Sequence, residues 1–296
     1  MVEESDMKLD ECSREAWCTF LGNEKNLGHT SRSLVGDSID SHVDACWNSA
    51  LQTVQRIQHD LPELVPKCIL EVGASSGLNC LALQKQWPQS KVLGIEPEVV
   101  AVKAAEAMAI SIEGPTPKFI VGVGEHLPLE NGSVDLIVCH TVIEHVKDVD
   151  AVISEMARVL SPNGVIHLEA PNYVWPHEPH LGIWCLPLLG KASVRLAAKL
   201  QRKGEEVPFL EHLQFVTPSR LEAIFARHDL AWDNRVQGKL QQVLCGESNH
   251  IKAYRRAAGL IRMFGYTGFG QLLLRFILWA NLYPSLLYTC RNNRGA

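Results

Sequence analysis

The sequence lacks several features that identify common classes of protein. None of its nine cysteines belongs to a C-x-x-C pair, which favours reduced, mostly buried thiols in a cytosolic protein. The acidic N-terminus has no apolar signal segment, so we expect no signal peptide. Basic charge is not in excess either, because 28 Lys+Arg against 33 Asp+Glu give a net charge of -5. That balance argues against a dedicated nucleic-acid binder.

Charge is nevertheless distributed unevenly along the 296 residues. From Lys191 onward there are 16 basic and 7 acidic residues, a local balance of +9, so the first 190 residues carry -14. Two sets of basic residues recur at helical spacing: Lys191, Arg195, Lys199 and Arg202, and Lys252, Arg255, Arg256 and Arg262. Each set is either a solvated helix face or a peripheral contact with an anionic membrane surface.

The stretch KCILEVGASSGLN, residues 67–79, organises the chain. It predicts a buried strand, a tight glycine turn and the start of a helix, which is the arrangement that holds nucleotides in α/β proteins. Glu71, near the end of the strand, suits a ligand that carries an ammonium group. The same letters match the Gly-x-Ser-x-Gly nucleophile elbow of hydrolases, with Ser75 as nucleophile, although no oxyanion-loop motif precedes them. The spacing does not match a nicotinamide site.

The rest of the chain predicts alternating helices and strands. We expect a loosely ordered arm over residues 1–38 and then one domain, 39–296. Helices are predicted at 41–58, from 78, at 99–108, 148–160 and 217–228, and strands at 67–72, 91–95, 118–123, 134–139, 165–170, 230–236 and 285–291. The tetrapeptide 161–164 is expected to end the helix before the fifth strand. The alternation predicts a doubly wound, mostly parallel, seven-stranded α/β sheet.

Glu96 ends the second predicted strand, about 25 residues beyond Glu71. A carboxylate about 20 residues after the glycine turn grips the ribose diol in nucleotide-binding folds. The alternative is an ordinary solvated helix cap.

In these ordered motifs the chain resembles the class I S-adenosylmethionine-dependent methyltransferases, specifically the ubiquinone-biosynthesis-like or type 11 group. The resemblance covers roughly residues 67–173 and is carried by ILEVGASSGLNCLAL, KVLGIEPE, GEHLPLENGSVDLIVCHTVIEHV and EMARVLSPNGVIHLEAPN. It implies a Rossmann-like fold and S-adenosyl-L-methionine as cofactor. The cofactor site that it implies consists of Glu71, Gly73, Ala74, Ser75, Gly77, Glu96, Pro97, Gly124, Glu125, His140 and Thr141.

Two positions depart from that family's pattern. Ser75 stands where the middle glycine of the first loop is usual, and Val123 stands where an aspartate often lies beside the adenine amino group. Serine is small enough to keep the turn. We therefore expect cofactor binding to survive, with adenine held by backbone groups and apolar packing.

Beyond the fifth strand two insertions are predicted. Residues 172–216 are too long for a simple connection and indicate a lid over the acceptor. A helical insertion at about 240–283 contains the apolar run 264–282, which Arg275 and two glycines interrupt, so that it falls short of a membrane span. We expect this run to be a buried helix, with an interfacial helix that dips into lipid as the alternative.

The predicted reaction is transfer of a methyl group to an oxygen of a small-molecule or lipid-linked acceptor. A binding protein that has lost transfer is the alternative. Four histidines follow strand ends or lie in the lid, and a neutral imidazole can accept a hydroxyl proton. We rank His180 first and His145 second as the base, ahead of His177 and His212. A metal site built from His177, His180 and His212 is a third and less favoured interpretation.

Overall fold

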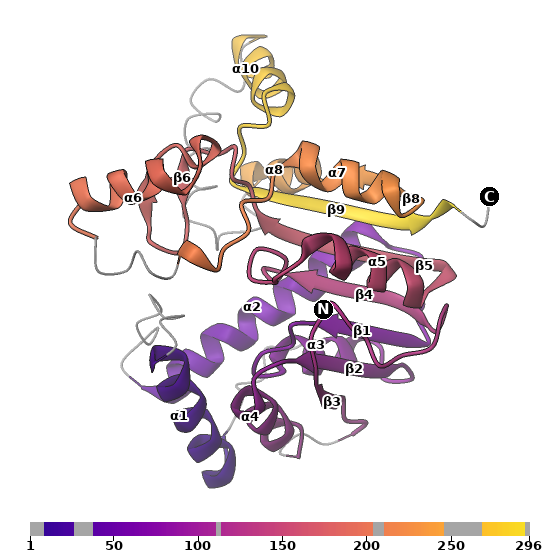
Figure 1. Ribbon diagram of the computed structural model, residues 1–296. Coiled ribbons are helices and arrows are strands. Elements are labelled where there is room, and N and C mark those ends of the chain that lie inside the picture. The colour runs from indigo at the N-terminus through magenta and orange to yellow at the C-terminus, as the bar shows by residue number, and fades with distance from the viewer. Residues whose placement is uncertain (1–8, 27–37, 111–113, 204–209, 246–267, 294–296) are drawn as a thin grey trace. The chain divides into compact units, whose positions relative to one another are not determined.

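The computed structural model describes residues 9–26, 38–110, 114–203, 210–245 and 268–293. Its seven-stranded sheet has the order β3-β2-β1-β4-β5-β9-β8 (Figure 1). The strands are β1 Cys68–Val72, β2 Lys91–Glu96, β3 Lys118–Val121, β4 Val134–His140, β5 Leu160–Pro171, β8 Leu230–Asn234 and β9 Ser285–Asn292. β1 runs parallel to β2 and β4, and β8 antiparallel to β9. The prediction of a doubly wound, mostly parallel sheet is confirmed.

The described helices include every helix predicted in this part of the chain. They are α1 Glu11–Asn26, α2 Ile39–Asp60, α3 Leu78–Gln86, α4 Val99–Ile110, α5 Val149–Val159, α6 Lys191–Leu200, α7 Pro218–Arg227, α8 Val236–Cys245 and α10 Gly268–Trp279. The chain divides into two compact units. The first holds Met1–Cys139, Ala151–Ile166 and Arg294–Ala296, and the second holds His140–Asp150 and His167–Asn293. Because β1, β2 and β4 are parallel, their carboxyl ends lie at one edge of the sheet, where ligands of open α/β sheets bind.

Helix α1 corrects the prediction of a loosely ordered arm over residues 1–38. Trp17 and Phe20 are buried and pack edge to face, with ring centroids 5.6 Å apart. The Ser13 hydroxyl donates to the carbonyl of Ala107, in the last turn of α4, at 3.1 Å. The apolar residues of α1 are too few to give a strong helical period, so the sequence pattern alone does not reveal this helix.

Strand β5 corrects the predicted start of the fifth strand, because it begins at Leu160 and includes the tetrapeptide 161–164, whereas the sequence places the start of the strand at Val165. The backbone passes so close to its neighbour at Gly164 that an added Cβ would lie 2.8 Å from the carbonyl oxygen of Val134. The Ser161 hydroxyl donates to Asp135 at 2.9 Å. These contacts with the start of β4 therefore accompany the extended conformation of this segment.

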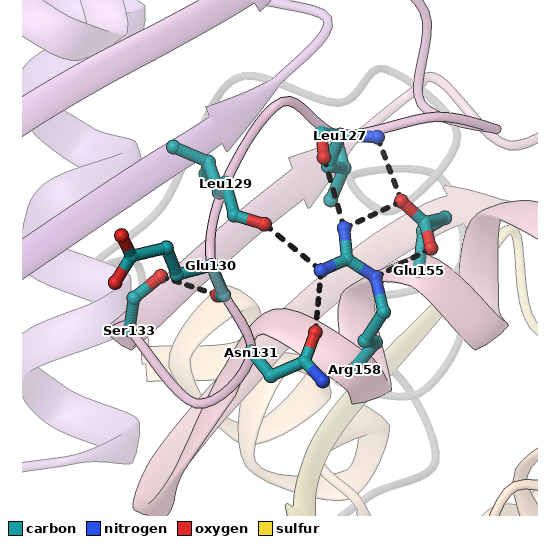
Figure 2. A network of polar contacts seen from close by, with 7 residues as sticks. All are labelled: Leu127, Leu129, Glu130, Asn131, Ser133, Glu155 and Arg158. Atoms are coloured by element: carbon teal, nitrogen blue, oxygen red, sulfur yellow. Dashed lines mark hydrogen bonds and ion pairs between the residues drawn. The ribbon is translucent and has the colours of Figure 1, made fainter.

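The side chain of Arg158 joins α5 to the loop before β4 (Figure 2). Its guanidinium donates to the carbonyls of Leu127 and Leu129 at 2.9 and 2.8 Å and to Asn131 at 2.7 Å. It also pairs with Glu155, whose carboxylate accepts the backbone N–H of Leu127 at 2.8 Å. One charged side chain thereby satisfies several loop acceptors and fixes the loop that follows Gly124 and Glu125.

The second unit contains the predicted lid as a small folded region. A two-stranded ribbon, β6 His177–Glu178 and β7 Ile183–Trp184, is followed by the short helix η1 Pro187–Leu189 and by α6. Their core is formed by Leu181, Ile183, Val194, Ala198, Leu210 and Leu213. The lid segment therefore has a hydrophobic core of its own.

Helix α10 corrects the expectation that the apolar run is buried. Leu272, Phe276 and Trp279 are 66%, 52% and 79% exposed. In the described part of the chain, no helix combines the length and the apolarity that crossing a membrane requires. The second basic set, Lys252, Arg255, Arg256 and Arg262, lies outside the described residues.

Candidate functional site

The turn between β1 and α3 is shaped by three residues with positive φ. Gly73 has φ 73, Ser75 φ 47 and Gly77 φ 80. A Cβ at Gly77 would lie 2.6 Å from that of Ala105 and 2.7 Å from the Phe119 ring, so only glycine fits there. The N–H groups of Gly73 and Ala74 both donate to the carbonyl of Ile95, at 2.8 and 3.0 Å. The turn is thereby held against the end of β2.

Glu96 lies at that end of β2, as the sequence predicts, and is almost fully buried. Its carboxylate accepts the backbone N–H of Ser75 at 2.8 Å and that of Glu98 at 3.1 Å. The first bond links the two loops that follow β1 and β2. A carboxylate fixed in this way is preorganised to accept further hydrogen bonds from a diol.

Glu71 is buried beside the same turn. Its two oxygens accept hydrogen bonds from Asn79 Nδ2 at 2.8 Å and from the Cys80 thiol at 2.9 Å. Burial raises the pKa of Glu71 to about 7, against the hydrogen bonds from Cys80 and Asn79, which lower it. A cationic ligand nearby would favour the ionised form. The sequence did not reveal Asn79 and Cys80 as partners, although both lie in the first turn of α3.

The loop after β3 supplies a third part of this region. Gly124 is buried, and an added Cβ would lie 3.1 Å from Cγ1 of Val72 and 3.3 Å from Val152. Val123 pairs with His126 in an isolated bridge and leaves its side chain 45% exposed. Glu125 is partly exposed. The first unit therefore brings together the predicted residues of β1, β2 and this loop.

His140 and Thr141 belong to the second unit. The two ring nitrogens His140 Nε2 and His167 Nδ1 are 2.7 Å apart. Thr141 has φ 54, an unusual backbone conformation for a β-branched residue, and its N–H donates to the carbonyl of Glu169 at 2.8 Å. Strained positions of this kind cluster at functional sites.

The two candidate bases, His145 and His180, also lie in the second unit, and their rings meet edge to face with centroids 5.0 Å apart. His180 Nδ1 donates to Oε1 of Glu178 at 2.6 Å. Glu144 is completely buried, and His145 Nε2 lies 3.9 Å from its Oε1. Burial raises the pKa of Glu144 to about 7. Each acid stands one or two residues before its histidine, which is the only sequence signal for it.

The other two histidines have different surroundings. The ring of His177 packs on Trp184 at 5.2 Å, and His212 is exposed. Among the described residues, the group whose donors are close enough to hold a metal ion is Glu144, His145 and His180, with ligand atoms within 4.8 Å of one another. This group differs from the set His177, His180 and His212 that the sequence offers.

Comparison with known proteins agrees with this geometry. Residues 70–168 match a family described as a methyltransferase domain. Norajmaline N-methyltransferase of Rauvolfia serpentina is 35% identical over 109 residues, 36% of this chain and 37% of that protein. Ubiquinone biosynthesis O-methyltransferase of Xanthomonas campestris is 28% identical over 156 residues, 52% of this chain and 59% of that protein. The chain thus spans less than two thirds of the length of the curated relatives it matches.

A solved structure shares the fold over most of both chains. It is the plantazolicin methyltransferase BpumL in complex with a pentazolic desmethylPZN analogue and SAH. The TM-score is 0.51 at 15% identity, and the match covers 95% of this chain and 96% of that one. At this identity the likeness concerns the fold alone.

Proposed function

We propose that the whole protein transfers a methyl group to an acceptor. The proposal starts from residues 70–168, which form a class I S-adenosylmethionine-dependent methyltransferase domain. The observation that carries the proposal is the Glu96 carboxylate, held by the N–H groups of Ser75 and Glu98 beside the glycine turn. The methyltransferase match also favours cofactor binding over the hydrolase interpretation of Ser75.

The residues of the first unit fit an adenosyl amino acid. Glu96 would accept the two ribose hydroxyls, and Glu71 would face the ammonium group of the methionine part. The turn 73–77 offers backbone groups, and the exposed Val123 offers an apolar surface for adenine in place of the usual aspartate. When bound, S-adenosylmethionine supplies a methyl group that its positive sulfur already activates. The roles predicted for Pro97, Glu125, His140 and Thr141 stay predictions.

The acceptor is proposed to be a hydroxyl of a small-molecule or lipid-linked compound, activated at His180 and His145. Known relatives include both N- and O-methyltransferases. The histidine cluster supports oxygen, because a hydroxyl has to lose its proton to become a good nucleophile. Imidazoles can bring this about in two ways, by accepting the proton or by holding a cation that lowers the pKa of the hydroxyl.

A membrane-linked acceptor has support of its own in the second unit. The side chains of Leu272, Phe276 and Trp279, spaced at four and three residues, form one exposed apolar stripe of α10. Residues 184–203 contain five basic residues and no acidic one. We therefore propose that this unit lies against an anionic lipid surface.

Calorimetric titration with S-adenosylhomocysteine tests the cofactor site. Glu96→Ala should weaken binding at least tenfold, because each hydrogen bond to a buried charged acceptor is worth roughly 1.5 to 3 kcal/mol. Glu96→Gln, which keeps one acceptor oxygen, should have an affinity for S-adenosylhomocysteine between those of the parent and Glu96→Ala. The matched control is Glu98→Ala, which retains the backbone N–H bonded to Glu96 and should bind as the parent does. Equal affinity in folded Glu96→Ala and parent protein would refute the ribose role.

A further inference from the structure

We infer that Glu144, His145 and His180 form a binding site for one divalent first-row transition-metal cation. The site itself is inferred from the second unit alone, and its role in catalysis rests on the proposed methyl transfer. The argument starts from a polar group that the fold leaves unsatisfied.

The carboxylate of Glu144 is completely buried, and neither of its oxygens has a hydrogen-bond partner. A second buried polar atom nearby, the hydroxyl of Tyr173, has none either. Burial and the negative charges of Glu178 and Glu144 raise the pKa of Tyr173 well above its usual value, so this hydroxyl senses the same carboxylates. Burying an unpaired carboxylate is costly unless it pairs with a cation or coordinates a metal. The unsatisfied atoms therefore indicate a ligand of positive charge.

The two histidines supply matching donors. Glu178 accepts the Nδ1–H of His180 with Oε1 at 2.6 Å and the N–H of Leu181 with Oε2 at 2.6 Å. An imidazole that donates through Nδ1 to a carboxylate presents Nε2 as the ligand atom, which is the arrangement usual around metal-binding histidines. His145 Nε2 lies on the side of Glu144, 3.9 Å from its Oε1.

The spacing and the chemistry of these donors narrow the ion. The ligand atoms lie within 4.8 Å of one another. Bonds of about 2.0–2.2 Å at tetrahedral angles place ligand atoms about 3.3–3.6 Å apart, so the side chains need to close by about 1 Å to share one ion. Two imidazoles and one carboxylate are the donor set of several catalytic zinc sites, which keep a fourth position open. Mg²⁺ and Ca²⁺ prefer all-oxygen sites.

An ion held by these residues would activate an acceptor in the second of the two ways, by lowering the pKa of its hydroxyl, whose proton would pass to water. In the proposed transfer that oxygen would form the bond to the methyl carbon as the carbon–sulfur bond breaks and sulfur keeps the electron pair. His145 and His180 act in this scheme as ligands and Glu178 as the residue that positions His180.

Calorimetric titration of the full chain, freed of metals with a chelator, tests the site. ZnCl₂ should bind at one ion per chain, and MgCl₂ should not bind at the same concentrations. Glu144→Gln and His180→Asn should each weaken zinc binding at least tenfold, and Glu178→Gln by about 10 to 100-fold, as expected for a carboxylate that orients a ligand. His212→Ala, an exposed histidine of the same unit, should bind zinc as the parent does.

Melting temperatures of the metal-free proteins separate loss of a ligand from loss of fold. Glu144→Gln removes a buried carboxylate whose oxygens accept no hydrogen bond, so it should melt at or above the parent temperature while no longer responding to zinc. No stoichiometric zinc binding by the parent, or equal binding by both ligand variants, would overturn the site. Zinc binding by a protein that fails to bind S-adenosylhomocysteine would support the site and remove its role in methyl transfer.

Discussion

Ser75 occupies a backbone conformation that usually belongs to glycine. Its φ of 47 lies in the left-handed region, which costs a non-glycine residue about 1–2 kcal/mol. The conformation persists because the Ser75 N–H donates to Glu96 and the flanking glycines define the turn. Strain held by surrounding contacts is typical of residues at binding sites.

Ser75→Gly should relieve this strain, which is at least as large as the cost of the entropy that glycine adds to the unfolded chain. Its free energy of unfolding should therefore equal that of the parent or exceed it by up to about 1 kcal/mol. Ser76→Gly is the matched control, since Ser76 has no positive φ and should lose about 0.5–1 kcal/mol. Urea unfolding of both variants measures this. The account of Ser75 is wrong if the two substitutions destabilise the protein equally.

Which site residues the sequence could reveal depends on how local their signal is. Glu71, Gly73, Gly77 and Glu96 stand in fixed order around one turn, so their spacing was enough to place them. Tertiary structure decides that Glu144 is buried beside two histidines, one of them 36 positions further along the chain (His180). No local pattern reports such a contact. The catalytic roles of His180 and His145 stay predictions.

Three elements of the second unit meet at one buried ion pair. Lys239 of α8 pairs with Glu169 of β5, and Ser285 of β9 contacts both, at 3.2 Å from Lys239 Nζ and 3.1 Å from Glu169 Oε1. Burial alone would raise the pKa of Glu169, but the charges of Lys239 and His140 outweigh it and lower the pKa to about 2. The contact therefore joins elements far apart in the sequence, and it makes the stability of the fold sensitive to acid.

This pKa gives a stability prediction with a defined sign. An unfolded glutamate has a pKa of about 4.3, so ionised Glu169 stabilises the folded state above that value, and the stabilisation disappears as pH falls toward about 2. Glu169→Gln should thus be less stable than the parent by a few kcal/mol at pH 6, and the gap should shrink steadily at lower pH.

Urea unfolding at a series of pH values measures that gap. Glu130→Gln, at an exposed glutamate, is the control and should stay close to the parent throughout. A gap that does not change with pH would show that the ion pair is not what links this contact to protons.

Elements were predicted well where periodicity is strong and poorly where neighbours decide. Helix α2 and strands β1, β2 and β4 follow their apolar patterns closely. The tetrapeptide 161–164 has the residues of a turn and yet extends β5, because pairing overrides local preference. Apolar composition alone did not decide whether the stripe of α10 is buried or exposed.

The whole chain separates its charge, with -14 in the first 190 residues and +9 in the remainder. A surface Lys or Arg near anionic lipid contributes about 1 kcal/mol, and exposed apolar side chains of α10 would add to this. The proposed contact with lipid combines both terms. Added salt should therefore weaken binding to lipid, because it screens the charges, but it should not abolish binding, because the apolar contribution remains.

Co-sedimentation with vesicles that contain phosphatidylglycerol tests the contact. The parent should pellet at low salt, and less so with phosphatidylcholine vesicles. Phe276→Asp and Trp279→Asp should stay largely in the supernatant, because each puts a charge where the apolar stripe meets lipid. Val65→Asp, at an exposed apolar residue of the first unit, should pellet with the parent. If the parent protein stays in the supernatant with anionic vesicles, the basic residues and the apolar stripe of α10 do not bind lipid and the proposed contact is wrong.

The hydrogen bond from Cys80 to Glu71 also affects how readily the thiol of Cys80 reacts with electrophiles. Only a thiolate attacks alkylating agents and peroxides at a useful rate. Burial and the neighbouring carboxylate raise the pKa of Cys80 well above its usual value, so it keeps its proton while holding Glu71 in place. Cys12 and Cys18 are exposed on α1, far along the chain from this turn. Reagents that modify thiols will consequently mark α1 long before they reach the groups that would hold the methionine part of the cofactor.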